Sequence, residues 1–164
     1  MKTRVSSAKV NPKKMVIMAE KNCELPDCNP PEADIVRLLE QSHTIAVVGL
    51  SPKEQRDSNR VARYLIEQGY DVIPVNPGQE NLLGRRCYRR VSEVPVKIDI
   101  VDCFISPSRI PQVVEEAVEV GAGTLWMQLG VVHNEAAARA REAGLQVVMN
   151  KCIMVEHKRL KAAS

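Results

Sequence analysis

From residue 32 onward, short apolar runs alternate along the chain with segments of helical periodicity. The apolar runs are continuous, which is typical of strands buried on both faces of a parallel sheet. Strands are predicted at residues 44–49, 70–75, 98–105, 124–129 and 145–149. Helices are predicted at residues 32–41, 59–68 and 134–143, between a Ser108 cap and Gly121, and in a last segment that includes residues 155–160. Because strands joined by helices require right-handed crossovers, this order predicts an α/β fold: a three-layer, Rossmann-like sandwich with a parallel sheet of about five strands flanked by helices.

Residues 1–31 differ from the remainder of the 164-residue chain. Basic residues are followed there by a Pro- and Asn-containing stretch that ends in Asn29-Pro30-Pro31. Such a segment has little reason to form a packed core of its own. We therefore expect a peripheral or mobile N-terminal arm at residues 1–31 and one Rossmann-like domain at residues 32–164.

Two cysteines, Cys23 and Cys28, lie in the arm. A metal site would need two further ligands, for which Cys152 with His157 is the one distant candidate pair. We interpret Cys23 and Cys28 as incidental thiols and predict no metal site.

The formal net charge of +3 and the aromatic content of 3% limit the classes of ligand. Few aromatic side chains argue against single-stranded nucleic acid, which binds by stacking. The charge is too small to indicate duplex binding, but it suits an anionic small molecule. No segment approaches the roughly 20 apolar residues of a membrane span, and the apolar run at 15–19 is too short for a signal peptide. The five scattered cysteines are not the framework of a secreted protein, so we expect a cytoplasmic protein with reduced thiols that binds neither nucleic acid nor membranes.

The ligand site is expected at the carboxyl ends of the strands, which share one edge of a parallel sheet. Five loops follow these ends, and all of them should lie on that edge. They contain Gly49, Leu50 and Ser51; Asn76 and Pro77; Ser106 and Pro107; Gln128, Leu129 and Gly130; and Asn150, Lys151 and Cys152.

The loop after the first strand has the features of a phosphate site. Gly49 permits a tight turn, and the loop then leads to the N-terminus of the next helix, whose unpaired N–H groups attract anions. Ser51 and Ser58 offer hydroxyl donors. Lys53 and Arg56, with Arg60 beyond them, add positive charge, so we predict that this loop binds phosphate.

The dinucleotide fingerprint is incomplete in this chain. It requires three glycines at G-x-G-x-x-G and an acidic residue at the end of the second strand. Gly49 stands alone, and the second strand ends in Asn76. These departures count against NAD, whereas NADP is less strongly excluded because Arg85 and Arg86 lie nearby.

Several longer motifs occur in a familiar order. They are VGLS at residues 48–51, GYDVIPVNP at 69–77, WMQLG at 126–130, AGL at 143–145, and Cys152 followed by EHKRL at 156–160. Over roughly residues 32–160 the chain resembles the small stand-alone CoA-binding proteins, which are similar to the CoA-binding domain of the succinyl-CoA synthetase α subunit.

The resemblance implies that coenzyme A lies across the strand ends. Its phosphate loop would correspond to Gly49 and Ser51, its adenosine-side turn to Asn76 and Pro77, and its turn after the fourth strand to Gln128 and Gly130. Two positions depart from the family pattern. Ile105 stands where members commonly have Arg, and Lys151 replaces an Arg and lacks its planar fork. Cys152 would lie near the far end of the pantetheine arm.

Cys152, Glu156 and His157 invite a catalytic interpretation. However, positions i and i+5 of one helix give poor geometry for a Cys–His hydrogen bond. We interpret the three residues as a buried cysteine and a turn that holds down the last helix, and we predict no catalytic residue.

The predicted function is binding of coenzyme A, or of an acyl-CoA, by a non-catalytic or regulatory module. Three alternatives stay open: a CoA- or thiol-dependent transferase that uses Cys152, an NADP-binding reductase that uses the same cleft, and a partner-binding protein with a degenerate cleft. A homodimer also stays open. The predicted ligand-binding residues are Gly49, Leu50, Ser51, Lys53, Arg56, Ser58, Asn76, Pro77, Ser106, Gln128, Gly130, Lys151 and Cys152.

Overall fold

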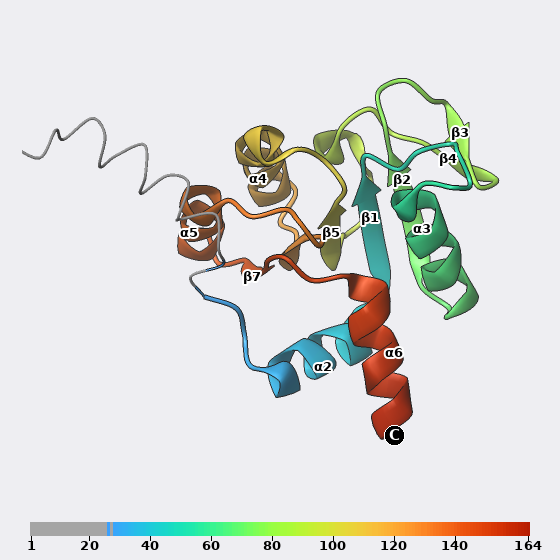
Figure 1. The fold of residues 1–164 in the computed structure, drawn as a ribbon. Coiled ribbons are helices and arrows are strands. Elements are labelled where there is room, and N and C mark those ends of the chain that lie inside the picture. The colour runs from blue at the N-terminus through green and yellow to red at the C-terminus, as the bar shows by residue number, and fades with distance from the viewer. Residues whose placement is uncertain (1–25, 27) are drawn as a thin grey trace, which may run out of the picture.

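The computed structural model describes residue 26 and residues 28–164, which form a three-layer α/β fold around a parallel sheet (Figure 1). The sheet has five strands in the order β2-β1-β5-β6-β7, and every pairing between neighbours is parallel. This confirms the fold class and the number of strands predicted from the apolar runs. The strands are β1 (Thr44–Val48), β2 (Asp71–Val75), β5 (Ile100–Cys103), β6 (Thr124–Met127) and β7 (Gln146–Val148).

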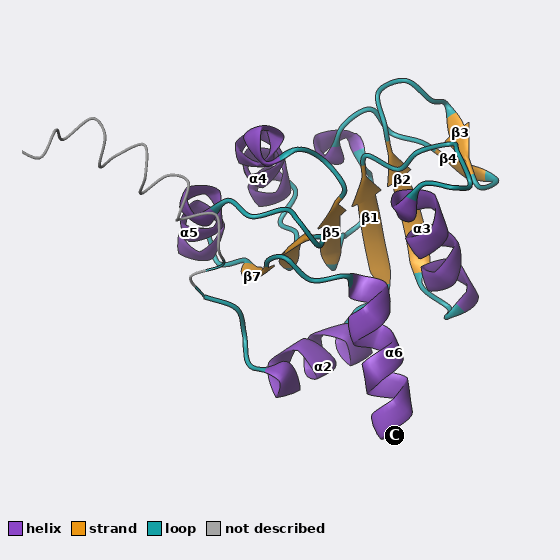
Figure 2. Ribbon diagram, viewed as in Figure 1, coloured by secondary structure: helices purple, strands orange, loops and turns teal. Residues whose placement is uncertain are grey.

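Helices cover both faces of the sheet because side chains of successive strand residues point to opposite faces. Ile45 and Val47 of β1 share one apolar core with three helices, whereas Ala46 and Val48 belong to the core on the other face. The first face carries α2 (Glu32–Gln41), α3 (Asp57–Glu67) and α6 (Ile153–Ala163); the second carries α4 (Ile110–Glu119) and α5 (Asn134–Glu142) (Figure 2).

The order of the strands reverses between β1 and β5. The chain runs from β1 outward to β2 and then returns to the other side of β1 as β5. In doubly wound sheets such a reversal separates the two flanking loops and leaves a crevice at the carboxyl ends of the strands. The loops after β1 and β5 therefore frame the expected ligand site.

Two helix starts differ from the sequence prediction, whereas α6 (Ile153–Ala163) includes residues 155–160 as predicted. α3 begins at Asp57, two residues early, so that Ser58 lies in its first turn. Ser108 does not cap α4: Pro107 starts a short 3₁₀ helix, η2 (Pro107–Arg109), that contains Ser108, and no side chain caps the helix that follows.

A small hairpin between β2 and β5 was missed by the sequence prediction. It consists of β3 (Asn81–Leu82) and β4 (Arg85–Arg86), and a second 3₁₀ helix, η1 (Val91–Glu93), follows it. Its two turn residues, Leu83 and Gly84, both have positive φ, of 53° and 70°. Two such residues are typical of tight hairpin turns, so Gly84 was the available signal.

Of the two cysteines in the predicted arm, Cys23 lies outside the described residues. Cys28 is exposed, and the side chain of Asn29 bonds both the backbone N–H and the carbonyl of Met149, at 2.7 and 2.8 Å. The division into an arm at 1–31 and a domain at 32–164 stays a prediction. Among the described residues, no helix is long and apolar enough to cross a membrane, and no group of three His, Cys, Asp or Glu residues is placed to hold a metal ion.

Candidate functional site

Gly49 occupies the point where the loops after β1 and β5 pass closest. It has a φ of +81°, and an added Cβ would lie 2.4 Å from the carbonyl oxygen of Phe104. Its N–H donates to the carbonyl of Val75 at the end of β2, at 2.9 Å. Only glycine allows both the positive φ and the close approach of the Phe104 carbonyl. Gly49 therefore joins the ends of β1, β2 and β5 at the reversal of strand order.

A hollow of about 360 Å³ opens beside Gly49 at this reversal. Ser51, Arg56 and Ser58 line it, together with Gly49, Asp57 and Phe104. The N-terminus of α3 lies at the edge of this hollow, and no side chain caps it. The first turn of a helix has N–H groups without acceptors inside the helix, and they carry partial positive charge. The hollow is therefore suited to an anion.

The two serine hydroxyls shape the loop. The N–H of Ser51 donates to the hydroxyl oxygen of Ser58 at 3.0 Å, and the N–H of Lys53 donates to the hydroxyl oxygen of Ser51 at 3.1 Å. The side-chain amide of Asn59 donates to the carbonyl of Ser51 at 2.9 Å. Because each hydroxyl oxygen accepts a bond here, its hydrogen stays available to donate to a ligand.

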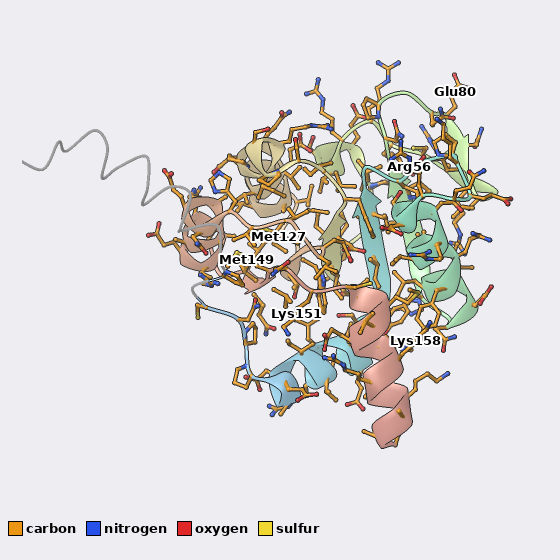
Figure 3. All side chains as sticks on the ribbon, in the orientation of Figure 1. Arg56, Glu80, Met127, Met149, Lys151 and Lys158 are labelled. Atoms are coloured by element: carbon orange, nitrogen blue, oxygen red, sulfur yellow. The ribbon has the colours of Figure 1, made fainter. Side chains whose placement is uncertain are left out.

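The charges around the hollow favour an anion. Arg56 and Lys53 are exposed and form no ion pair with another described residue. The carboxylate of Asp57, which also lines the hollow, is paired with Arg60 at 2.5 Å. Figure 3 labels Arg56 at the start of α3. The sequence prediction of positive charge at this loop thus matches the arrangement of the residues.

Asn76 and Leu50 join the turn after β2 to the loop after β1. The Asn76 side-chain N–H₂ donates to the carbonyl of Leu50 at 2.9 Å, and its oxygen accepts from the N–H of Gly78 at 2.8 Å. The side chain of Leu50 is fully buried in the core, so only its backbone faces the site. Pro77 lies exposed beside Asn76.

Gln128 does not point toward the ligand edge as expected. Its side chain is buried and donates to the carboxyl of Asp102 in the adjacent strand, at 2.5 Å. Burial raises the pKa of Asp102 to about 7, although the Gln128 hydrogen bond acts in the opposite direction. Asp102 was not predicted from the sequence, although a carboxylate within an otherwise apolar strand was an available signal.

The remaining predicted residues follow β5, β6 and β7. Ser106 is exposed, with its hydroxyl 3.2 Å from that of Ser108. The N–H of Gly130 donates to the side chain of Asn150 at 2.8 Å, which joins the turns after β6 and β7. The carbonyl of Lys151 accepts from the indole N–H of Trp126 at 2.8 Å, and the half-buried Cys152 immediately precedes α6.

The predicted residues thus form two groups on one sheet. Gly49, Ser51, Arg56 and Ser58 share the hollow at β1, whereas Gly130, Lys151 and Cys152 belong to the β6–β7 end. β7 is three strands from β1, which at about 4.8 Å per strand separates the two groups by about 14 Å. A ligand that contacts both groups has to be extended.

His157 connects α6 to α3, whereas Glu156 pairs within α6. Glu156 is buried and pairs with Arg159 at 3.2 Å. The Nδ1 atom of His157 lies 2.8 Å from the hydroxyl of Tyr64 on α3, and its ring packs edge-on against Tyr64 and Tyr70. Burial, together with Lys161, lowers the pKa of His157. His157 thus connects α6 to α3, as the predicted structural role requires. The prediction of a buried Cys152 beside a surface turn is wrong in detail, because Cys152 is half-buried and both Glu156 and His157 are buried.

His133 also has a structural role in the fold. Its Nδ1 atom accepts a hydrogen bond from the N–H of Ala136 at 3.1 Å and so caps α5.

Comparison with known proteins identifies similar chains of two kinds. A family model described as a CoA binding domain matches residues 43–158. The uncharacterized protein YneT of Bacillus subtilis is 40% identical over 129 residues, which are 79% of this chain and 96% of that protein. The solved structure of a hypothetical protein from Pyrococcus horikoshii has a TM-score of 0.78 and 44% identity, and the match covers 84% of this chain and 99% of that one.

Larger enzymes contain a similar segment. The ADP-forming acetate–CoA ligase I of Archaeoglobus fulgidus is 27% identical over 121 residues, which are 66% of this chain. The matched segment makes up 17% of that ligase, so this chain spans about a sixth of its length.

Proposed function

The chain belongs to the CoA binding domain family, and we propose that it binds coenzyme A, or an acyl-CoA, across the carboxyl ends of its parallel strands as a binding or regulatory module. One observation carries the proposal: the uncapped N-terminus of α3 opens into the hollow between the loops after β1 and β5. Doubly wound sheets bind nucleotides at this reversal of strand order, and helix N-termini bind phosphate.

The donors at the hollow fit a diphosphate. Ser51, Ser58 and Arg56 line the hollow at the first turn of α3, and the exposed Lys53 belongs to the same loop. Hydrogen bonds from such charged and backbone donors to phosphate oxygens are among the stronger ones in proteins. We propose that the diphosphate binds here and that the adenosine lies toward Asn76 and Pro77.

The pantetheine arm would extend from this hollow toward the turns after β6 and β7. The distance of about 14 Å between β1 and β7 suits an extended chain. Leu129, whose side chain is 71% exposed, lies on that route and offers an apolar contact. Ser106, Gly130, Lys151 and Cys152 are the proposed contacts along the arm, and the buried Gln128 contributes only by supporting the turn after β6.

One observation counts against NAD, and a second removes one of the two arginines that could meet the extra phosphate of NADP. The side chain of Asn76, at the position where a dinucleotide-binding carboxylate grips the ribose, is engaged with Leu50 and Gly78. Arg85 binds Asp71 and the carbonyl of Val72 near the start of β2, which leaves it turned away from the ligand edge. The alternative that Cys152 acts as a nucleophile gains no support from His157, because the Nδ1 atom of His157 is engaged with Tyr64.

Cys28, Cys87, Cys103 and Cys152 are all free thiols, which suits a reducing compartment, and we propose the cytoplasm. The activity of the acetate–CoA ligases is not part of the proposal, because this chain matches only 17% of the ligase sequence.

Calorimetry on the reduced full chain with CoA, NAD and NADP tests the proposal. CoA should bind selectively, and Arg56→Gln should weaken it about tenfold through loss of a charged hydrogen bond. The matched control is Arg37→Gln, which removes an exposed arginine of α2 that pairs with Asp34, and it should leave binding unchanged. Absence of CoA binding by the wild type would refute the proposed function.

A further inference from the structure

A second hollow, of about 650 Å³, lies beside the β3–β4 hairpin. Arg86, Tyr88 and Arg89 contribute to its lining, as do Glu80 and Glu93. Neither arginine forms an ion pair with another described residue. The neighbouring Arg85, by contrast, pairs with Asp71 at 3.0 Å. The hairpin therefore presents two guanidinium groups whose charge is not neutralised by a carboxylate.

The hairpin is attached directly to the end of β2. Tyr88 forms a parallel bridge with Val75. Its N–H donates to the carbonyl of Pro74 at 3.0 Å, and its carbonyl accepts from the N–H of Asn76 at 2.9 Å. Cys87 adds a contact from its sulfur to the carbonyl of Asn76 at 3.5 Å. The hollow is thus a direct continuation of the Asn76 turn.

Arg86 is held by stacking on Tyr88. Its guanidinium carbon lies 5.2 Å from the centre of the Tyr88 ring. A cation over an aromatic face is attracted to it, and stacking restricts the side chain before any ligand arrives. The planar guanidinium can then donate two parallel hydrogen bonds to one phosphate.

The two carboxylates of the hollow differ in position. Glu93 accepts the backbone N–H of Arg89 at 3.3 Å, so its charge is partly satisfied by the loop itself. Figure 3 labels Glu80 at the outer margin above β3 and β4. These carboxylates reduce the net positive charge of the hollow. An anion would therefore bind here through direct hydrogen bonds to an arginine, and not through the overall electrostatic potential.

We infer that Arg86, assisted by Arg89, binds the phosphate monoester on the 3′-position of the CoA ribose. The inference rests on the proposed function. In doubly wound folds the end of the second strand lies at the nucleotide ribose, and an arginine nearby accommodates a phosphate on that ribose. The hairpin places Arg86 in this position through Tyr88. The consequence is selectivity for CoA over dephospho-CoA, which differs only by that phosphate.

Calorimetry with CoA and dephospho-CoA tests this inference on the full chain. The wild type should bind CoA at least tenfold more tightly than dephospho-CoA. Arg86→Gln should lower the affinity for CoA about tenfold and leave the affinity for dephospho-CoA unchanged. Arg85→Gln is the matched control, since it removes the adjacent arginine that pairs with Asp71, and it should alter neither affinity. Circular dichroism of both variants confirms that the fold is retained.

The following results would overturn the inference, and they show whether the proposed function fails with it. Equal binding of CoA and dephospho-CoA by the wild type would overturn the inference and leave the proposed function standing. An equal loss of both affinities in Arg86→Gln would also overturn it, because Arg86 would then act on the part that both ligands share. Failure of the wild type to bind either ligand would refute the proposed function and the inference with it.

Discussion

The side-chain amide of Gln128 donates a hydrogen bond to the buried carboxyl of Asp102 across two adjacent strands, at 2.5 Å. The second oxygen of Asp102 is buried and has no partner among the described residues. A carboxylate in this position loses its hydration without full replacement, so the neutral acid is favoured. Burial accordingly raises the pKa of Asp102 from 3.8 to about 7.

The stability of the protein should therefore depend on pH through Asp102. Because the pKa is higher in the folded chain, the contribution of Asp102 to stability is complete below pH 3.8 and is lost as the pH rises to about 7. Asp102→Asn removes this loss. Between pH 5 and pH 8, the free energy of unfolding of the variant should gain about 3 kcal/mol on that of the wild type, as measured by urea denaturation. His157 titrates in both proteins and cancels in the comparison, so parallel pH profiles would contradict the raised pKa.

Gly49→Ala should destabilise the protein and abolish CoA binding. The positive φ costs about 1–2 kcal/mol for a residue with a Cβ, and the overlap with the Phe104 carbonyl should add about 1–3 kcal/mol. Gly121→Ala is the control, because Gly121 has a φ of +68° but nothing within 4 Å of an added Cβ. Urea midpoints of the two variants compare the costs directly. Equal losses would mean that the close approach to Phe104 is unimportant.

Asn29→Ala should lower the free energy of unfolding by about 1–2 kcal/mol, since it removes two hydrogen bonds to the backbone of Met149. Met149 follows β7, an edge strand, and Asn29 satisfies backbone groups there that would otherwise be unpaired. Asn81→Ala serves as the control, because the exposed side chain of Asn81 forms no hydrogen bond with another described residue. A wild-type unfolding curve for Asn29→Ala would show that this contact does not anchor the segment.

Tyr64→Phe should cost about 1 kcal/mol of stability at pH 8 and leave CoA affinity unchanged. Burial lowers the pKa of His157, so the imidazole is neutral at that pH, and the variant removes the hydrogen bond between its Nδ1 atom and the Tyr64 hydroxyl. Tyr88→Phe is the matched control, since the Tyr88 hydroxyl forms no bond within the described part of the chain. Thermal unfolding of both variants gives the difference. A loss of CoA affinity in Tyr64→Phe would instead connect His157 to the ligand site.

Local patterns predicted most of the fold and part of the site. The helix at Glu32–Gln41 and all five strands of the main sheet were placed within a few residues, because continuous apolar runs and helical periodicity are properties of neighbouring residues. Gly49 at the end of β1 and a helix overlapping α3 were also found in this way. The hairpin β3–β4 was missed because each of its strands has two residues, too few for a periodic signal.

Gln128 shows where local reasoning fails. It follows β6 and has a polar side chain, so it was assigned to the ligand edge, yet Asp102 in the next strand holds it inside the protein. The partner is 26 residues away in the chain, and no local pattern records that a buried carboxyl there needs a donor. The pairing of Arg85 with Asp71, 14 residues away, was likewise not visible in any local pattern.

The amino-acid sequence by itself determined which segments are strands and helices, because these depend on the periodicity of neighbouring side chains; the need for glycine at position 49 comes from the approach of Phe104 in the folded chain. The tertiary structure alone decided the order β2-β1-β5-β6-β7, and with it the hollow between Gly49 and Phe104. It also decided which polar groups face a ligand and which satisfy each other inside the sheet. Those pairings join residues distant in the chain, and they are selected by the free-energy cost of leaving a buried polar group without a partner.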